Sequence, residues 1–166
     1  METTFYVAGA VAVIATVMVI ASTHAVHALL YLIVSLLAVA LLFYPLGAPF
    51  AALLEVIIYA GAIMVLFVFV TMMLNLGAAA VGQERRWLRA VPWGGPALLA
   101  AILLGELAWV LAGNHALTAA ATVDAHAVGA ALFGPYLLGV ELGSLLLLAG
   151  LLGAWHLRRR DLESRT

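Results

Sequence analysis

Five long apolar stretches alternate with short polar or proline-containing segments along the chain. They cover about residues 5–22, 28–46, 51–76, 92–111 and 136–157. A helix rises about 1.5 Å per residue, so about 20 apolar residues cross a hydrocarbon core of about 30 Å. Because each stretch is close to this length or longer, the pattern predicts an all-α integral membrane protein with five transmembrane helices.

The third stretch, residues 51–76, contains the most informative polar positions. As a helix it would be about 39 Å long, so it must tilt, protrude or deform. Gly61 lies in its middle, and glycine allows a helix to bend or widen because it lacks a Cβ. Glu55 and Tyr59 are four residues apart, which places both on one face of an α-helix. We therefore expect a membrane helix with a polar, deformable section.

The segments between the stretches predict turns and loops rather than further domains. Pro45, Gly47 and Pro49 separate the second helix from the third. Residues 77–91 form the only loop between spans that contains Arg, and residues 113–134 are too polar to span, although they have room for one short surface helix. We expect residues 1–166 to form a single membrane domain.

The positions of the seven arginines predict the topology. Three lie in the loop 77–91 and four follow the fifth helix: Arg85, Arg86, Arg89, Arg158, Arg159, Arg160 and Arg165. With five spans these two segments share one side, and loops rich in Lys and Arg stay in the cytoplasm. The sequence therefore predicts a periplasmic N terminus, a periplasmic loop 113–134, a cytoplasmic loop 77–91 and a cytoplasmic C terminus.

Composition supports a membrane protein and excludes several kinds of site. Hydrophobic residues make up 67% of the 166 residues, charged residues make up 9%, and the mean hydropathy is +1.20. The chain has no cysteine, so it has no thiolate to hold an iron–sulfur cluster. The chain has no basic patch with interleaved aromatic residues, so nucleic acid binding is not predicted. It also has no glycine-rich loop after a strand, so nucleotide binding is not predicted. The histidines lie near span ends and are interpreted as interfacial residues, so we expect no metal.

Three acids lie inside the predicted spans at a similar depth: Glu55, Glu106 and Glu141. Acids in membrane helices usually face protein or water, and at one depth on several helices they can line a proton path. An equally good interpretation is that each acid forms a hydrogen bond to a neighbouring helix. The residues alone thus leave three classes open, namely a subunit of a membrane complex, a small transporter and a scaffold.

Four segments then resemble, in order, one family over nearly the whole chain. They are HALLYLIVSLLAVALLFYPLGAPF, LEVIIYAGAIMVLFVFVTMMLNL, QERRWL and LFGPYLLGVELGSLLLLAG. Together they resemble the J subunits of bacterial respiratory complex I, the proton-pumping NADH:quinone oxidoreductase, of the enterobacterial type. Relatives usually have Asn-Pro-Val-His before the second helix, whereas this chain has His24-Ala25-Val26-His27.

The resemblance implies a membrane-arm subunit of the bacterial inner membrane, with no catalytic site and no redox centre of its own. FMN and iron–sulfur clusters are expected in other subunits, and quinone in a neighbouring one. Expected partners are the K, A and H subunits, the antiporter-like subunits and the lipid bilayer.

For the third helix, the resemblance implies a π-bulge that changes conformation and couples quinone reduction to proton transfer. The matching hinge residues are Tyr59, Gly61, Met64, Val65 and Phe67, and the proton-path residues are Glu55, Tyr59 and Glu141. The alternatives are a subunit of a related cation/proton antiporter or membrane-bound hydrogenase, and a purely structural assembly subunit.

Overall fold

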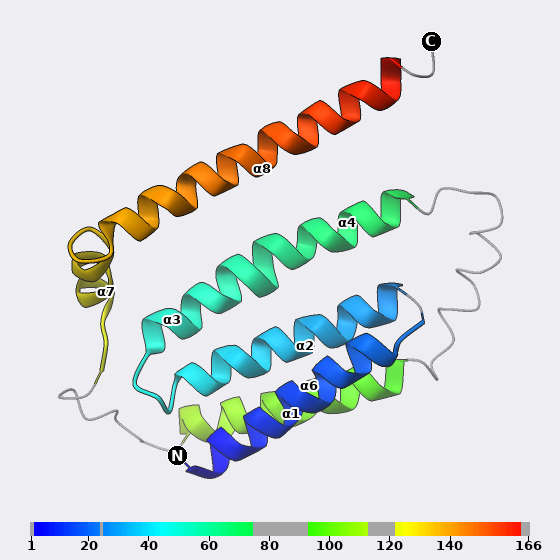
Figure 1. Cartoon of the computed structure of the whole chain (residues 1–166). Coiled ribbons are helices and arrows are strands. Elements are labelled where there is room, and N and C mark those ends of the chain that lie inside the picture. Colours follow the sequence, from blue (N-terminus) through cyan, green and yellow to red (C-terminus); the bar gives the residue numbers. More distant parts are fainter. Residues whose placement is uncertain (1, 24, 75–92, 113–121, 164–166) are drawn as a thin grey trace. The chain divides into compact units, whose positions relative to one another are not determined.

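The computed structural model describes residues 2–23, 25–74, 93–112 and 122–163, with side chains described up to residue 157. Within these residues every element of regular secondary structure is a helix: α1 (Glu2–Ala21), α2 (Ala25–Phe43), α3 (Pro49–Leu54), η1 (Glu55–Ile63), α4 (Met64–Leu74), α6 (Gly94–Ala112), α7 (Ala125–Leu132) and α8 (Leu137–Glu163). The segments α3, η1 and α4 follow one another without a break and form the third membrane helix (Figure 1).

Five helices are long and apolar enough to cross a membrane. Their spans are Glu2–Ala21, Ala25–Phe43, Pro49–Met73, Gly94–Ala112 and Leu137–Leu157. This confirms the predicted all-helical class and the five spans. The predicted loop 77–91 and residues 113–121 of the second loop lie outside the described residues.

Helix ends differ from the predicted ends by a few residues. The second helix was expected at 28–46 and lies at Ala25–Phe43, because the chain turns at Gly47, whose φ is 77°. Only glycine adopts this left-handed conformation without steric cost. The last helix continues to Glu163, since arginine, leucine and glutamate are good helix formers and a helix can leave the membrane without ending.

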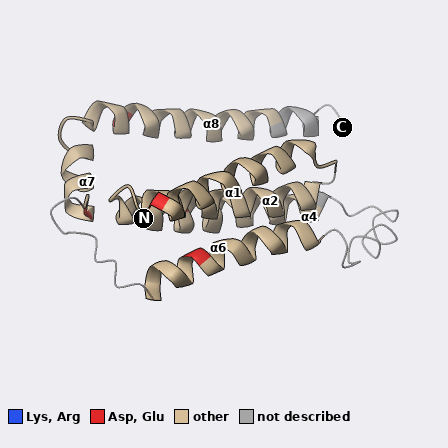
Figure 2. Cartoon of the chain, turned by 90° about the horizontal axis from the view of Figure 1, so that it is seen from below, with Lys and Arg blue, Asp and Glu red and all other residues tan. Residues whose placement is uncertain are grey.

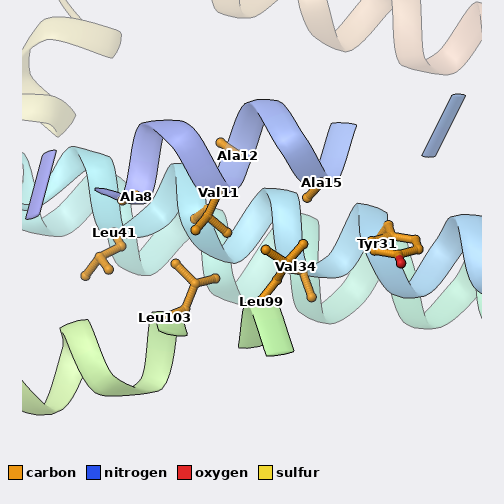
Figure 3. Close-up of a cluster of buried hydrophobic side chains, with 10 residues drawn as sticks. Ala8, Val11, Ala12, Ala15, Tyr31, Val34, Leu41, Leu99 and Leu103 are labelled. Carbon is orange, nitrogen blue, oxygen red and sulfur yellow. The ribbon is translucent and has the colours of Figure 1, made fainter. Parts of the chain in front are cut away.

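The chain divides into two compact units, Met1–Val123 and Asp124–Thr166. In the first unit α2 is the central helix and contacts α1, α6 and the third membrane helix. Figure 3 shows the core between α1, α2 and α6. It consists mainly of alanine and valine on α1, larger side chains on α2 and two leucines on α6: Ala8, Val11, Ala12, Ala15, Tyr31, Val34, Ala38, Leu41, Leu99 and Leu103.

Small residues and hydroxyl groups join α1 to α2. The alanines of α1 let the two backbones approach closely. The hydroxyls of Thr16 and Ser35 lie 2.8 Å apart and share one hydrogen bond. Both also lie within hydrogen-bond distance of the Ala12 carbonyl oxygen, at 2.8 Å from Thr16 and 3.3 Å from Ser35, so one hydroxyl can donate to the carbonyl while the other donates to its neighbour. These polar groups are therefore satisfied inside the bundle, as a membrane interior requires.

Tyr31 and Gly95 fix the contact between α2 and the start of α6. Tyr31 is buried, and a Cβ added to Gly95 would overlap its hydroxyl and lie 3.0 Å from its Cζ. By contrast, a Cβ added to Gly94 would meet nothing within 4 Å. Gly95 is thus the position where α6 comes closest to the tyrosine ring.

A short loop links α2 to the third helix. The Gly47 N–H donates to the Tyr44 carbonyl, and the Ala48 N–H donates to the Phe43 carbonyl. The Gly47 carbonyl in turn accepts a 2.8 Å hydrogen bond from the Val123 N–H. The start of the third helix is therefore tied to the chain that follows α6.

The second unit contains α7 and α8, which contact each other. The Asp124 carboxylate accepts a 2.9 Å hydrogen bond from the Ala127 N–H and caps the start of α7. This short helix lies within the predicted loop 113–134, at the place where the sequence left room for one. A turn over residues 133–136 leads into α8.

Candidate functional site: the π-helical segment of the third membrane helix

The third membrane helix changes its hydrogen-bonding pattern in the middle. α3 begins at Pro49, which suits a first helical position because proline lacks an N–H. Over Glu55–Ile63 the segment is π-helical, and α-helix resumes at Met64. In a π-helix each N–H bonds a carbonyl five residues back, and most π-helical segments are single turns inside α-helices. Nine residues in this form are therefore unusual.

Met64 marks the return to α-helix and is the best buried side chain of the segment. Its N–H faces the carbonyls of Tyr59 and Gly61, and the Tyr59 bond spans five residues. The Met64 side chain is 2% exposed, and it is the largest fully buried side chain among the described residues. Since η1 and α4 both contact α2, this methionine holds the C-terminal end of the π-helix against the rest of the bundle.

Gly61 is sensitive to any added side chain. A Cβ placed there would lie 3.1 Å from the Val56 carbonyl oxygen, closer than an ordinary van der Waals contact. The two residues are five apart, which is the spacing of π-helical hydrogen bonds. The π-helical form therefore has little room for a side chain at this position.

Glu55 and Tyr59 lie within the same π-helical segment. Glu55 is its first residue and is partly buried, and Tyr59 is 50% exposed. The four-residue spacing was interpreted with α-helical geometry, whereas the segment pairs residues five apart. The described residues show no hydrogen bond between the two side chains, so their joint role stays a prediction.

The other predicted site residues lie outside the π-helix. Met64, Val65 and Phe67 belong to α4, and the latter two are exposed. The bulge was expected over Tyr59 to Phe67, so the observed π-helix lies four residues earlier. The run Val56-Ile57-Ile58 could have indicated this earlier position, because β-branched side chains crowd an α-helix.

Glu141 and Glu106 are on other helices. Glu141 is exposed on α8 in the second unit, and its backbone carbonyl accepts a 2.7 Å bond from Ser144 Oγ. Glu106 is partly buried on α6. In the part of the chain that the structure describes, no three His, Asp or Glu side chains come close enough to hold a metal ion. Acidic side chains are few on the described helices (Figure 2).

The candidate site is therefore the change from α-helix to π-helix and back within the third membrane span. A π-helix and an α-helix of equal length present different side chains to their neighbours and leave different backbone groups free. Interconversion would therefore change both packing and access of water around Glu55 and Tyr59. These features define a multi-pass helical membrane protein with a π-helical segment inside one of its spans.

Comparisons with known proteins identify the family. A sequence model of NADH-ubiquinone/plastoquinone oxidoreductase chain 6 matches residues 15–157. The NADH-quinone oxidoreductase subunit J of Pseudomonas aeruginosa is 61% identical over 163 residues, which is 97% of this chain and 98% of that protein. Subunit J of Escherichia coli K12 is 54% identical over 162 residues, 97% of this chain and 88% of that protein. Subunit J of Rhodobacter capsulatus is 40% identical over 161 residues, 90% and 77% of the two chains.

The chain belongs to the NADH-ubiquinone/plastoquinone oxidoreductase chain 6 family. The resemblance inferred from its sequence segments is thereby confirmed, including its enterobacterial relatives.

Proposed function

We propose that the chain is the J subunit in the membrane arm of a proton-translocating NADH:quinone oxidoreductase, and that its π-helical segment helps couple quinone reduction to proton transfer. The observation that carries the second part is the nine-residue π-helix at Glu55–Ile63, inside a span that is otherwise α-helical. π-helical segments inside α-helices are frequent at functional sites.

The coupling rests on two forms of one helix. In the π-helical form the hydrogen bonds join residues five apart, and Gly61 lies close to the Val56 carbonyl. In a regular α-helical form the residues beyond the segment would rotate relative to those before it, because fewer residues complete each turn. Side chains such as Tyr59 and Val65 would then face different neighbours and open or close a water path.

The same proposal includes the setting of the subunit. It would lie in the bacterial inner membrane beside the K, A and H subunits and the antiporter-like subunits. The chain itself would bind no cofactor; FMN, iron–sulfur clusters and quinone would be held elsewhere in the complex. The high identity to proteins named subunit J favours this assignment over an antiporter, a hydrogenase or a scaffold.

Replacing Gly61 by valine tests the two-form helix. Valine is stiff at χ1 and its Cβ falls 3.1 Å from the Val56 carbonyl oxygen, so it disfavours the π-helical form. A shift of about 1.4 kcal/mol changes the ratio of the two forms tenfold. We expect the complex to assemble, while NADH oxidation with quinone and proton uptake by inverted vesicles both decrease.

Ala62→Val is the matched control. Ala62 lies one residue further in the same segment, already has a Cβ and is exposed. This variant should retain activity. Full activity in an assembled Gly61→Val complex would contradict the coupling role, and loss of assembly in Gly61→Val alone would mean that Gly61 serves close packing.

A further inference from the structure

A tight corner over residues 133–136 joins α7 to α8 in the second unit. The Phe133 N–H donates to the Gly129 carbonyl at 3.0 Å, which continues α7 into the corner. The Tyr136 N–H donates to the Ala131 carbonyl at 3.1 Å, so the end of the corner is bonded back to α7. In Figure 1 and Figure 2 alike, α7 lies across the axis of α8. Backbone hydrogen bonds therefore fix two helices in a crosswise arrangement.

Gly134 is the residue on which the corner depends. A Cβ added there would lie 2.7 Å from the Ala130 carbonyl oxygen, a distance that Cβ atoms essentially never reach. This oxygen belongs to the backbone, so it cannot move aside as the end of a flexible side chain can. By contrast, a Cβ added to Gly129 in α7 would meet nothing within 4 Å. A side chain at position 134 would therefore force the corner to open.

The corner lies directly at the end of a membrane span. The apolar part of α8, Leu137–Leu157, has 21 residues, and at a rise of about 1.5 Å per residue it matches a hydrocarbon core of about 30 Å. Its first residue therefore lies at the edge of the core, and residues 133–136 lie at the level of the headgroups. Because α7 runs across α8 at this point, it lies along the membrane surface.

The two sides of α7 differ in polarity. Val128 and Ala131 are half-buried, and the spacing of three and four residues places Leu132 on the same side. His126 is exposed on the opposite side. Since α7 contacts α8, its half-buried side faces the span and with it the membrane. The short helix thus turns apolar residues towards the bilayer and its histidine towards water, as helices at membrane interfaces do.

The largest apolar side chains of the corner are exposed. Phe133 is 75% exposed, Tyr136 is 66% exposed and Leu132 is 42% exposed. Apolar surface is unfavourable in water, whereas a tyrosine at the membrane boundary keeps its ring among apolar groups and its hydroxyl among polar ones. Residues 124–136 contain no Lys or Arg, so an anionic headgroup has no cation to pair with there.

We propose that α7 and the corner form a lipid-binding anchor, in which Leu132, Phe133 and Tyr136 insert at the boundary between headgroups and acyl chains where α8 begins. The contact is apolar, so a zwitterionic phospholipid is sufficient. The anchor holds the start of the last span at a fixed depth. It involves only the second unit and does not depend on the coupling role proposed for the third helix.

Photoactivatable phosphatidylcholines test the anchor in the assembled complex, reconstituted into phosphatidylcholine vesicles. One reagent carries a diazirine close to the glycerol, the other carries it at the end of an acyl chain, and mass spectrometry locates the adducts. The shallow reagent should label Leu132, Phe133 and Tyr136 several times more than the deep reagent does, and it should label His126 less than these three. A corner that neither reagent labels is covered by protein or surrounded by water, and a corner labelled mainly by the deep reagent lies inside the core. Either result overturns the proposal.

Gly134→Ala and Gly129→Ala are a matched pair for the role of the corner. The first adds a Cβ against a backbone oxygen, and the second adds the same group in open space. We expect Gly134→Ala to lose most of the shallow adduct at Leu132, while Gly129→Ala retains it. Equal labelling of the two variants would show that the corner does not hold α7 at the membrane, which contradicts the anchor. If Gly134→Ala prevents assembly, the depth profile of the wild-type complex decides. Neither measurement uses NADH oxidation or proton uptake.

Discussion

At the residue scale, the third helix combines one crowded position with one anchored position. Gly61 has little room for a Cβ in the π-helical form, and Met64 is buried where α-helix resumes. Most side chains between Glu55 and Met64 are exposed, so few of them pack against the other helices of this chain. The proposed change of hydrogen-bonding pattern would therefore take place beside a fixed boundary at Met64.

Glu55 and Tyr59 provide the residue-scale prediction. If they organise water beside the π-helix, Glu55→Gln and Tyr59→Phe should leave assembly intact and slow proton uptake in inverted vesicles driven by NADH. We expect a partial loss, because each change removes one ionisable or hydroxyl group and retains the side-chain volume. Val70→Ile, at an exposed position in α4 outside the predicted hinge, serves as the control. Normal uptake in both variants would assign Glu55 and Tyr59 to packing alone.

The sequence predicted the position of the irregular section of the third helix better than its extent. Gly61 within a long apolar run indicated where a helix could widen, and the resemblance added a π-bulge. Neither indicated that the π-helix begins at Glu55, because helix type depends on which carbonyl each N–H reaches after packing against α2. The partial burial of Glu106 could not be predicted either, since it depends on which side of α6 meets α1 and α2.

At the element scale, α2 determines how the first unit is built. It contacts α1 through alanines and a pair of hydroxyls, α6 through Tyr31, and the third helix along α3, η1 and α4. The sequence predicted the helices from hydrophobic length alone. It did not predict which faces of the helices pack, because all faces of these helices are apolar and no amphipathic stripe distinguishes a lipid-facing side from a protein-facing side.

The contact between α2 and α6 gives a prediction on stability. Gly95→Ala places a Cβ where the Tyr31 hydroxyl lies, and overpacking of this kind costs about 1–3 kcal/mol. The thermal midpoint of the detergent-solubilised complex should fall. Gly94→Ala is the matched control, because its Cβ meets nothing within 4 Å and the gain in helix propensity is shared.

A second substitution shows whether the tyrosine is responsible. Tyr31→Phe removes the overlapping hydroxyl, so the double variant with Gly95→Ala should recover part of the lost stability. Recovery should be incomplete, since the added Cβ would still lie 3.0 Å from the Cζ atom. Equal thermal midpoints for Gly95→Ala and Gly94→Ala would show that α6 moves away from α2 at little cost.

At the scale of the whole molecule, the chain has five apolar helices long enough to span a membrane, and its arginines all lie outside them. The described helices contain few acids, and all seven arginines lie in residues 85–89 and 158–165. The number of spans follows from hydrophobic length and agrees with the structure. The orientation follows from the charges only, because a set of helices without a bilayer has no inside or outside.

Cysteine accessibility tests this orientation. The chain has no cysteine of its own, so a single introduced thiol reports one position without background from this subunit. A cysteine at Ala125, at the exposed start of α7, should react with an impermeant maleimide added to the periplasmic side of intact spheroplasts. Loops rich in Lys and Arg remain in the cytoplasm, and the segment around Ala125 contains neither residue. A cysteine at Ala80, in the arginine-containing loop outside the described residues, should react only in inverted vesicles.

Two further cysteines test the termini. Thr166→Cys, next to the last arginine, should react in the same preparation as Ala80→Cys, since an odd number of spans separates each of them from the N terminus. Thr3→Cys should follow Ala125→Cys, since an even number of spans, four, separates these two positions. The reverse pattern at all four positions would invert the topology, and agreement of Thr3→Cys with Thr166→Cys would mean that one of the five apolar helices does not cross the membrane.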